Sequence, residues 1–374
     1  MKIVHVCDYI QPQLGYQEYY LAKEHAKMGH EVTVITSDRY YPFPNYENTA
    51  EKILGDRKIG VGITNIDGFK IIRLKSKLEF GTKNWLIGLE KEISKISPDL
   101  LICHGMDTFN AYRVAKLKKK FSFKLIYDDH PYTPFKKISA IKSIYYYFFN
   151  FKLIERMADK LIIKSQDGLK HVNLYYKFKK PVIVGALGVD SNLFKFNKLL
   201  RRKIRQKYSI SPKEVVLIYT GKITENKGVH LILKAISKSR IDNVVLIILG
   251  DGDPVYRQKL EKLSRKQKVI FIGAVKNNEM YKYFSAADIA IYPCESTISL
   301  FEAMSCSLPI ICNVADSEII KYNNGFAINA RVKEISKKIQ FLVKNAKLRK
   351  KMGKNSRIYV EKELSWRKIA EKFL

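Results

Sequence analysis

The chain of 374 residues has few cysteines and no long apolar run. No Cys-x-x-Cys motif and no Cys/His cluster of metal-ligand spacing occurs, which excludes a disulfide or zinc framework and fits a reducing compartment. The five cysteines all stand in or beside apolar stretches: Cys7, Cys103, Cys294, Cys306 and Cys312. No apolar run approaches the ~20 residues of a membrane-spanning helix. The N-terminal segment MKIVHVCDYI soon turns polar, so it predicts a first strand and not a signal peptide.

Acidic residues are scarce beside basic ones. The 36 Asp and Glu stand against 68 Lys and Arg, which gives a formal net charge of +32. This excess favours an anionic partner: a nucleic acid, an acidic membrane surface or a phosphorylated ligand. No helix-turn-helix, zinc-finger or RNP-like aromatic signature is present, so we expect no specific nucleic acid. A basic nucleic-acid-binding protein stays open as an alternative function.

The segment Phe135–Arg156 interleaves aromatic and basic residues. This composition is typical of a helix in a membrane interface, but the pattern is apolar on more than one side, which favours a helix packed on the first sheet. The two can coexist at different ends of the segment. We therefore expect a cytoplasmic protein that is soluble or peripheral on the inner face of the cell membrane, where it would meet an anionic membrane surface.

Short β-branched runs alternate with longer amphipathic stretches such as Gln17–Met28 and Leu86–Ile96. Apolar runs without polar alternation suit parallel strands covered on both faces, and strand–helix alternation predicts an α/β doubly wound sheet. The predicted strands are Lys2–Val6, Glu31–Thr36, Phe69–Leu74, Asp99–Cys103, Phe123–Tyr127, Lys160–Lys164, Val215–Tyr219, Val244–Leu249, Val269–Ile272, Asp288–Tyr292 and Leu308–Cys312. The pattern restarts after a polar, basic stretch that begins at Phe194 and reads as a linker. The fold class is therefore α/β, with two Rossmann-like doubly wound domains facing across a cleft.

A polar loop follows the strand that ends near Pro293, and a helix is predicted to begin near Ser299. Free backbone N–H groups and the positive end of a helix dipole are the ingredients of a diphosphate site. Glu302 falls one turn into this helix, where its carboxylate either accepts both hydroxyls of a ribose or only complements the helix dipole. The candidate donor contacts of this segment are Ser296, Thr297, Ile298, Ser299 and Glu302.

A second segment, Leu217–Gly228, combines a strand, a glycine turn and two lysines. Gly221 allows the backbone to approach a phosphate closely, and Lys222 and Lys227 can neutralise it. The alternative is a pair of solvated surface lysines. Gly252, in the turn Gly-Asp-Gly after another predicted strand, is a further candidate donor contact.

These segments resemble the donor site of family-four retaining glycosyltransferases with the GT-B fold (glycosyl transferases group 1). In that family, a loop Glu and a helix Glu are separated by seven residues, ahead of Ala-Met and a Leu-Pro step. The resemblance assigns the ribose to Glu302 and the donor diphosphate to Lys222 and Lys227. Only six residues separate Glu295 from Glu302, and Cys294 holds the strict position. Either of these two can therefore hold the first acidic-motif position.

The first half resembles the same family. Gly15 stands where the family has a double glycine in a loop that closes over the diphosphate. His130 lies near the family's histidine close to the reacting sugar, and His104 is the candidate for acceptor contact. Together the resemblance implies His130, Glu295, Lys222 and Lys227 as catalytic residues.

The resemblance implies domains at residues 1–195 (acceptor side) and 196–355 (nucleotide-sugar binding), with residues 356–374 as a helix crossing back to the first. It implies a retaining hexosyltransferase that uses no metal and no cofactor beyond its donor substrate, a UDP- or GDP-linked sugar. The resemblance implies a donor site that does not depend on a metal-binding Asp-x-Asp motif. The acceptor would be a glycan or lipid-linked glycan in cell-envelope polysaccharide or protein N-glycan assembly. A sugar-nucleotide epimerase on the same fold stays open.

Overall fold

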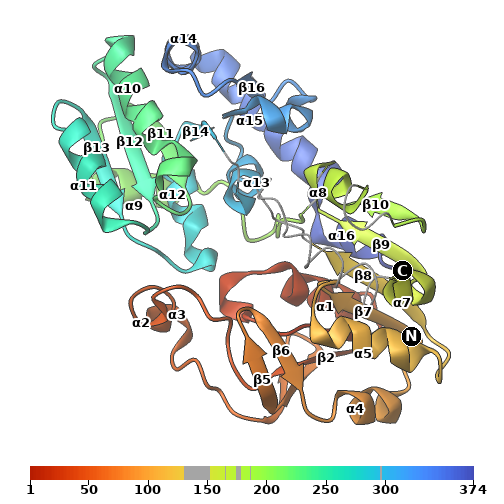
Figure 1. The fold of residues 1–374 in the computed structure, drawn as a ribbon. Helices are drawn as coiled ribbons and strands as arrows, with labels where there is room; N and C mark the ends of the chain where they lie inside the picture. Colours follow the sequence, from red (N-terminus) through yellow and green to blue (C-terminus); the bar gives the residue numbers. More distant parts are fainter. Residues whose placement is uncertain (130–151, 165, 174–177, 186, 295–296) are drawn as a thin grey trace. The chain divides into compact units, whose positions relative to one another are not determined.

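The computed structural model describes residues 1–129, 152–164, 166–173, 178–185, 187–294 and 297–374. Contacts between Cα atoms divide the chain into two compact units (Figure 1). Unit 1 is Met1–Leu187 together with Trp366–Leu374, and unit 2 is Gly188–Ser365. The predicted domain limits, at 195 and 355, both lie inside unit 2. Most of Phe135–Arg156 lies outside the described residues.

Unit 1 is built on an eight-stranded sheet with the order β10-β9-β8-β7-β1-β2-β4-β3. Every pairing is parallel except that of β3 with β4 at one edge. The chain therefore winds outward from β1 in both directions, as in a Rossmann-like sheet. The strands are β1 (Lys2–Val6), β2 (Glu31–Ser37), β3 (Gly62–Ile66), β4 (Phe69–Leu74), β7 (Leu100–His104), β8 (Lys124–Asp129), β9 (Lys160–Ile163) and β10 (Val182–Val184).

Successive residues of these strands pack on opposite faces of the sheet, because side chains alternate along a strand. Val4 and Leu101 pack with helices on one face, whereas Ile3 and Ile102 pack in a second core on the other. A separate two-stranded hairpin joins β5 (Ser76–Phe80) and β6 (Lys83–Leu86). The described helices of unit 1 are η1 (Pro12–Leu14), α1 (Gln17–Lys27), α2 (Tyr46–Thr49), α3 (Glu51–Leu54), α4 (Leu89–Ile96), α5 (Phe109–Lys118), α7 (Lys152–Met157), α8 (Gln166–His171) and α16 (Trp366–Glu371).

The C-terminal helix α16 completes the second core of unit 1. The Trp366 indole stacks on the Tyr20 ring of α1, with ring centroids 5.0 Å apart and planes inclined by 10°. Ile369, Ala370 and Phe373 are buried in the same core. The last residues of the chain thus stabilise the first helix.

Unit 2 is built on a six-stranded sheet with the order β13-β12-β11-β14-β15-β16, and all its pairings are parallel. Renumbered from β11, this is the 3-2-1-4-5-6 order of a Rossmann fold. The strands are β11 (Val215–Thr220), β12 (Val244–Leu249), β13 (Lys268–Ile272), β14 (Ile289–Tyr292), β15 (Ile310–Asn313) and β16 (Gly325–Ile328). The described helices are α9 (Lys198–Lys207), η4 (Glu225–Lys227), α10 (Val229–Ser239), α11 (Pro254–Leu263), η5 (Asn277–Glu279), α12 (Met280–Ala286), α13 (Ile298–Ser305), η6 (Val314–Ile320), α14 (Val332–Lys344), α15 (Ala346–Tyr359) and η7 (Val360–Leu364).

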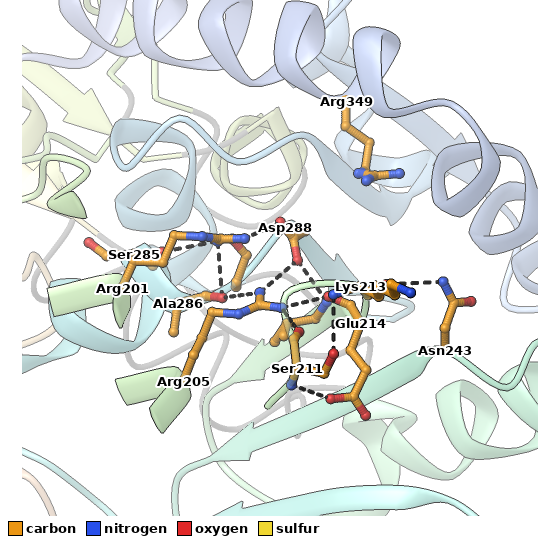
Figure 2. Close-up of polar contacts among 12 residues, drawn as sticks. Arg201, Arg205, Ser211, Lys213, Glu214, Asn243, Ser285, Ala286, Asp288 and Arg349 are labelled. Atoms are coloured by element: carbon orange, nitrogen blue, oxygen red, sulfur yellow. Dashed lines mark hydrogen bonds and ion pairs between the residues drawn. The ribbon is translucent and has the colours of Figure 1, made fainter. Parts of the chain in front are cut away.

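The basic stretch that begins at Phe194 was predicted to be a linker, and this was wrong: most of it forms α9, a helix of unit 2. Arg201 and Arg205 of α9 bind the two carboxylate oxygens of Asp288, at 2.7 and 3.2 Å (Figure 2). Asp288 also accepts the Val216 N–H at 2.8 Å. These cations therefore hold α9 against the amino ends of β11 and β14. Sequence reasoning missed this because the charges of Arg201 and Arg205 do not show that their partner, Asp288, lies more than 80 residues away in sequence.

Candidate functional site

The predicted donor segments meet at the carboxyl ends of two central strands of the unit 2 sheet. Strands β11 and β14 are neighbours, and the strand order reverses between them. The loop with Gly221 and Lys222 follows β11, and the loop that leads into α13 follows β14. Crevices at such a reversal, beyond the carboxyl ends of the strands, are where doubly wound sheets bind ligands.

Close packing of the backbone explains why glycine stands at two positions in the loops that follow β11 and β12. Gly221 has φ +137°, and a Cβ there would lie 3.3 Å from Thr297 Cγ2. A Cβ on Gly252 would lie 2.2 Å from the Ile223 carbonyl oxygen. The Ile223 N–H donates to Asp251 O at 3.0 Å, and the Asp253 N–H donates back to Ile223 O at 3.0 Å. Gly252 thus lets the β12 loop support the β11 loop, while its donor contact stays a prediction.

Buried hydroxyls fix the start of α13 against the end of β11. Thr220 Oγ1 lies 2.7 Å from the Tyr292 hydroxyl and 2.7 Å from Ser299 Oγ. Ser299 Oγ also donates to the Thr220 carbonyl at 3.1 Å. Because its hydroxyl is used inside the protein, Ser299 can offer a donor molecule its backbone N–H more readily than its side chain.

Helix α13 begins at Ile298, one residue before the predicted start. Its N-cap is Thr297, whose side chain makes no capping hydrogen bond, and its first turn contains no acidic residue. The first N–H groups of a helix lack partners within the helix and lie at the positive end of its dipole. This end of α13 therefore has the properties of an anion site.

Each lysine of the β11 loop is next in sequence to a glycine that packs closely on the segment between β14 and α13. Lys222 is exposed next to Gly221, and Lys227 is half-buried at the end of η4. The next residue, Gly228, has φ +71°, and a Cβ there would lie 2.5 Å from Cys294 Sγ. Lys227 is thus one residue from a direct contact with the segment that precedes α13.

Glu302 is buried in α13, with 4% of its surface exposed. Burial raises the pKa of its carboxyl to about 7, although a hydrogen bond from Asn277 lowers this pKa. Asn277 Nδ2 donates to Glu302 Oε1 at 2.7 Å. Asn277 begins η5, after β13, and sequence reasoning missed it because no local pattern links it to Glu302. A buried carboxyl of this pKa is poised to ionise when hydroxyl donors reach it.

The segments around Gly221, α13 and Glu302 lie in a part of the chain that is similar to known proteins. Residues 201–359 match the family model described as glycosyl transferases group 1. These residues form a group 1 glycosyltransferase domain. The family resemblance predicted from the sequence is thereby confirmed, and the matched range contains the β11 loop, α13 and Glu302.

Similarity extends beyond the group 1 domain. Over 285 residues the chain is 26% identical to an uncharacterized glycosyltransferase of Methanocaldococcus jannaschii, covering 71% of each protein. Over 366 residues it is 24% identical to the sulfoquinovosyl transferase SQD2 of Arabidopsis thaliana, covering 92% of this chain and 66% of that one. The structure of HepE from Anabaena in complex with UDP has a TM-score of 0.71 at 16% identity, covering 100% of this chain and 98% of that one. The last likeness confirms the GT-B fold with its two Rossmann-like domains.

Three predicted residues, Glu295, Ser296 and His130, lie outside the described residues. Cys294, the alternative for the first acidic-motif position, is half-buried and is the last described residue before Glu295. Roles at these positions stay predictions.

Two candidates belong to unit 1 and not to the group 1 domain. Gly15 has φ +67° and ends η1 just before α1. His104 ends β7 and is buried, with 7% of its surface exposed. Its Nδ1 lies 2.8 Å from Asp128 Oδ2, and its Nε2 lies 3.0 Å from His5 Nδ1. Since both ring nitrogens have protein partners, contact between His104 and an acceptor would require the ring to leave one of them.

Within the described ranges, no group of three or more His, Cys, Asp or Glu side chains is arranged to hold a metal ion. No helix among these described residues is both long and apolar enough to cross a bilayer.

Proposed function

We propose that this protein transfers a sugar from a nucleoside-diphosphate sugar to a glycan or lipid-linked glycan, with retention of the anomeric configuration. One observation carries the proposal. At the strand-order reversal of unit 2, an uncapped helix N-terminus, a glycine loop with Lys222 and Lys227, and the buried Glu302 follow neighbouring strands.

The N-terminus of α13 and the two lysines suit the leaving diphosphate. As the bond between sugar and phosphate breaks, negative charge grows on the phosphate while positive charge develops at the anomeric carbon. Positive groups held in place before the reaction stabilise that charge without reorganising. In this proposal no metal is needed at the phosphates, and a phosphate oxygen of the leaving group accepts the proton of the acceptor hydroxyl.

Glu302 suits the ribose of the donor. Its carboxyl has a pKa of about 7 because it is buried, with Asn277 donating to one oxygen. Hydroxyl groups that donate to a carboxylate favour the ionised form. Without a donor molecule, ionisation of this buried carboxyl is costly. Hydrogen bonds from the ribose hydroxyls of a bound donor would therefore stabilise the carboxylate.

The donor is proposed to be UDP-linked, with a GDP-linked sugar as the alternative. HepE from Anabaena, which shares the fold, has been solved with UDP and with UDP-glucose. A ligand that binds only the folded protein raises its unfolding temperature. Thermal unfolding with UDP, GDP and ADP, and then with the matching sugar nucleotides, identifies the base. An equal shift with all three would contradict base selection by this site.

Alanine at Lys227, and at Lys222, should reduce transfer by about 30- to 1,000-fold, which corresponds to ~2–4 kcal/mol of transition-state stabilisation. The matched control is Lys266→Ala, which removes the same charge from an exposed site just before β13, at the opposite edge of the sheet. Initial rates with purified, folded variants provide the measurement. Rates like those of the control would remove both lysines from the diphosphate site.

The same assay tests the other features of the proposal. Activity should persist in excess EDTA, and chelator inhibition reversed by Mg²⁺ or Mn²⁺ would contradict metal-independent transfer. NMR of the first product should show the donor's anomeric configuration, since inversion would rule out a retaining mechanism. Product analysis also distinguishes transfer from epimerisation of the donor.

We further propose that the protein acts on the cytoplasmic face of a membrane, as a peripheral protein. The support is the net charge of +32, since each Lys or Arg near an anionic surface contributes ~1 kcal/mol of binding. Co-sedimentation should then be strong with anionic vesicles at low salt, weaker at moderate salt, and absent with neutral vesicles. Indifference to anionic vesicles at low salt would favour a soluble acceptor.

A further inference from the structure

Three buried histidines of unit 1 form a continuous chain of hydrogen bonds that ends at Asp128. His25 Nε2 lies 3.1 Å from the Ala370 carbonyl oxygen, and His25 Nδ1 lies 3.1 Å from His5 Nε2. His5 Nδ1 lies 3.0 Å from His104 Nε2, and His104 Nδ1 lies 2.8 Å from Asp128 Oδ2. These four side chains, from α1, β1, β7 and β8, are called the His-Asp chain below.

Counting hydrogens sets the charge of the His-Asp chain. A carbonyl oxygen at one end and a carboxylate oxygen at the other can only accept, so its four hydrogen bonds need four N–H hydrogens. A neutral imidazole carries one N–H, so three neutral histidines supply three. One more proton, either on an imidazole or on the Asp128 carboxyl group, is required for every link to be made.

The surroundings locate that extra proton. Burial lowers the pKa of His5 well below its usual value and that of His25 to about 4, so both rings are neutral near pH 7. His30 stands beyond His25, with ring centroids 6.3 Å apart, and adds no negative charge there. The Asp128 carboxylate lies at the other end of the His-Asp chain, next to His104.

The groups around Asp128 favour its ionised form. Gln17 Nε2 of α1 donates to Asp128 Oδ2 at 2.8 Å. The Lys164 ammonium, just after β9, lies 3.9 Å from the same oxygen. Donated hydrogen bonds and a nearby cation both stabilise a carboxylate.

We infer that His104 is an imidazolium paired with the Asp128 carboxylate at neutral pH, and that His5 and His25 are positioning residues that hold this pair. The direction of every link follows. His104 donates from both nitrogens, to Asp128 and to His5; His5 donates to His25; and His25 donates to the Ala370 carbonyl of α16.

This inference changes the expected role of His104, and that step rests on the proposed transfer function. An imidazolium cannot accept a proton, so His104 cannot be the base for the acceptor hydroxyl. Strand β7 adjoins β1 where the strand order of unit 1 reverses, so the ion pair, whose two charges cancel, lies at the carboxyl ends of the strands, where such sheets bind ligands. Its contribution to transfer is electrostatic and positional.

Long-range ¹H–¹⁵N NMR of ¹⁵N-histidine-labelled protein tests the charge state without any activity. Near pH 7.5, where an ordinary histidine is about one-tenth protonated, His104 should show two protonated nitrogens, and His5 and His25 one each, on Nε2. Assignment uses His5→Gln, His25→Gln and His104→Gln. Three neutral rings, or an imidazolium at His5 or His25, would overturn the inference.

Asp128→Asn provides the matched comparison, with Asp129→Asn as its control. An amide cannot compensate a buried imidazolium, so the His104 signal should become that of a neutral ring in Asp128→Asn and stay unchanged in Asp129→Asn. Retention of the imidazolium in Asp128→Asn would also overturn the pairing. If Asp128→Asn does not fold, the spectrum of the unsubstituted protein still decides.

A kinetic measurement separates positioning from proton transfer. In His104→Gln, kcat/KM for the acceptor should fall while the donor KM and the shape of the pH–rate profile stay the same. Loss of an acidic limb from the profile would make His104 a base and contradict the inference. If no transfer is detectable in the unsubstituted protein, the proposed function fails, while the NMR result stands alone.

Discussion

Replacing Glu302 by glutamine should abolish most of the transfer activity and yet stabilise the protein above pH 7. The loss of activity follows from the ribose role, because glutamine offers one acceptor oxygen and Asn277 already donates to it. We expect a decrease of about 30- to 1,000-fold in kcat/KM for the donor. Initial-rate kinetics measures it.

The gain in stability follows from the raised pKa of Glu302. The pKa is about 7 in the folded protein and near 4.5 otherwise, so the folded state binds more protons between these values. The free energy of unfolding therefore falls as pH rises from 4.5 to 7, by about 3 kcal/mol in total. Glu302→Gln lacks this loss, so it should match the unsubstituted protein near pH 4 and exceed it near pH 8.

Urea unfolding at several pH values measures this difference, with Glu279→Gln as the control. Glu279 is partly exposed and pairs with Lys282 at 2.6 Å near the surface, so its substitution should change stability little at any pH. An active Glu302→Gln variant would remove Glu302 from donor binding, and a variant less stable than the unsubstituted protein at pH 8 would contradict the raised pKa of Glu302.

Trp366→Ala should destabilise unit 1 by about 3–5 kcal/mol, because it removes a buried indole and leaves a cavity beside Tyr20. Both tryptophans of the chain, Trp85 and Trp366, belong to unit 1, so the fluorescence of Trp85 still reports the unfolding of this unit in the variant. The transition should move to lower urea. Arg367→Ala, at an exposed position of the same helix, is the control.

An unchanged Trp85 transition in Trp366→Ala would mean that α16 adds little to unit 1. Ligand-induced stabilisation of unit 2 by the nucleotide should be unaffected in either variant, which separates a local effect on unit 1 from global misfolding.

The fold was largely predictable because most strands of the two large sheets contain runs of apolar residues. The predicted strands Phe69–Leu74 and Val244–Leu249 agree with β4 and β12 at both ends. The missed strands carry weaker signals. Most residues of β3 are exposed, and Phe80 of the β5–β6 hairpin is 74% exposed. Edge strands and hairpins without a buried face give no run of apolar residues to recognise.

The local geometry of the candidate site was predictable where it depends on short motifs, while the donor-binding roles of its residues stay predictions. The Gly221 turn, the start of α13 and the position of Glu302 within it all follow from neighbouring residues. Asn277, His5 and His25 were missed because each acts through a partner far away in sequence, such as His104 for His5. Within strand β1, His5 looks like one polar residue in an apolar run, and only the tertiary fold reveals its partner.

The two ends of unit 2 lie side by side. The Val189 N–H donates to the Leu364 carbonyl at 2.7 Å, and Val189 forms a parallel bridge with Ser365. Because unit 1 resumes at Trp366, unit 2 is in effect an insertion whose entry and exit coincide. Such a segment can be excised with little penalty for joining or freeing its ends. Residues 188–365 are thus a natural fragment for studying nucleotide recognition in isolation, and a cassette that could be exchanged between homologues.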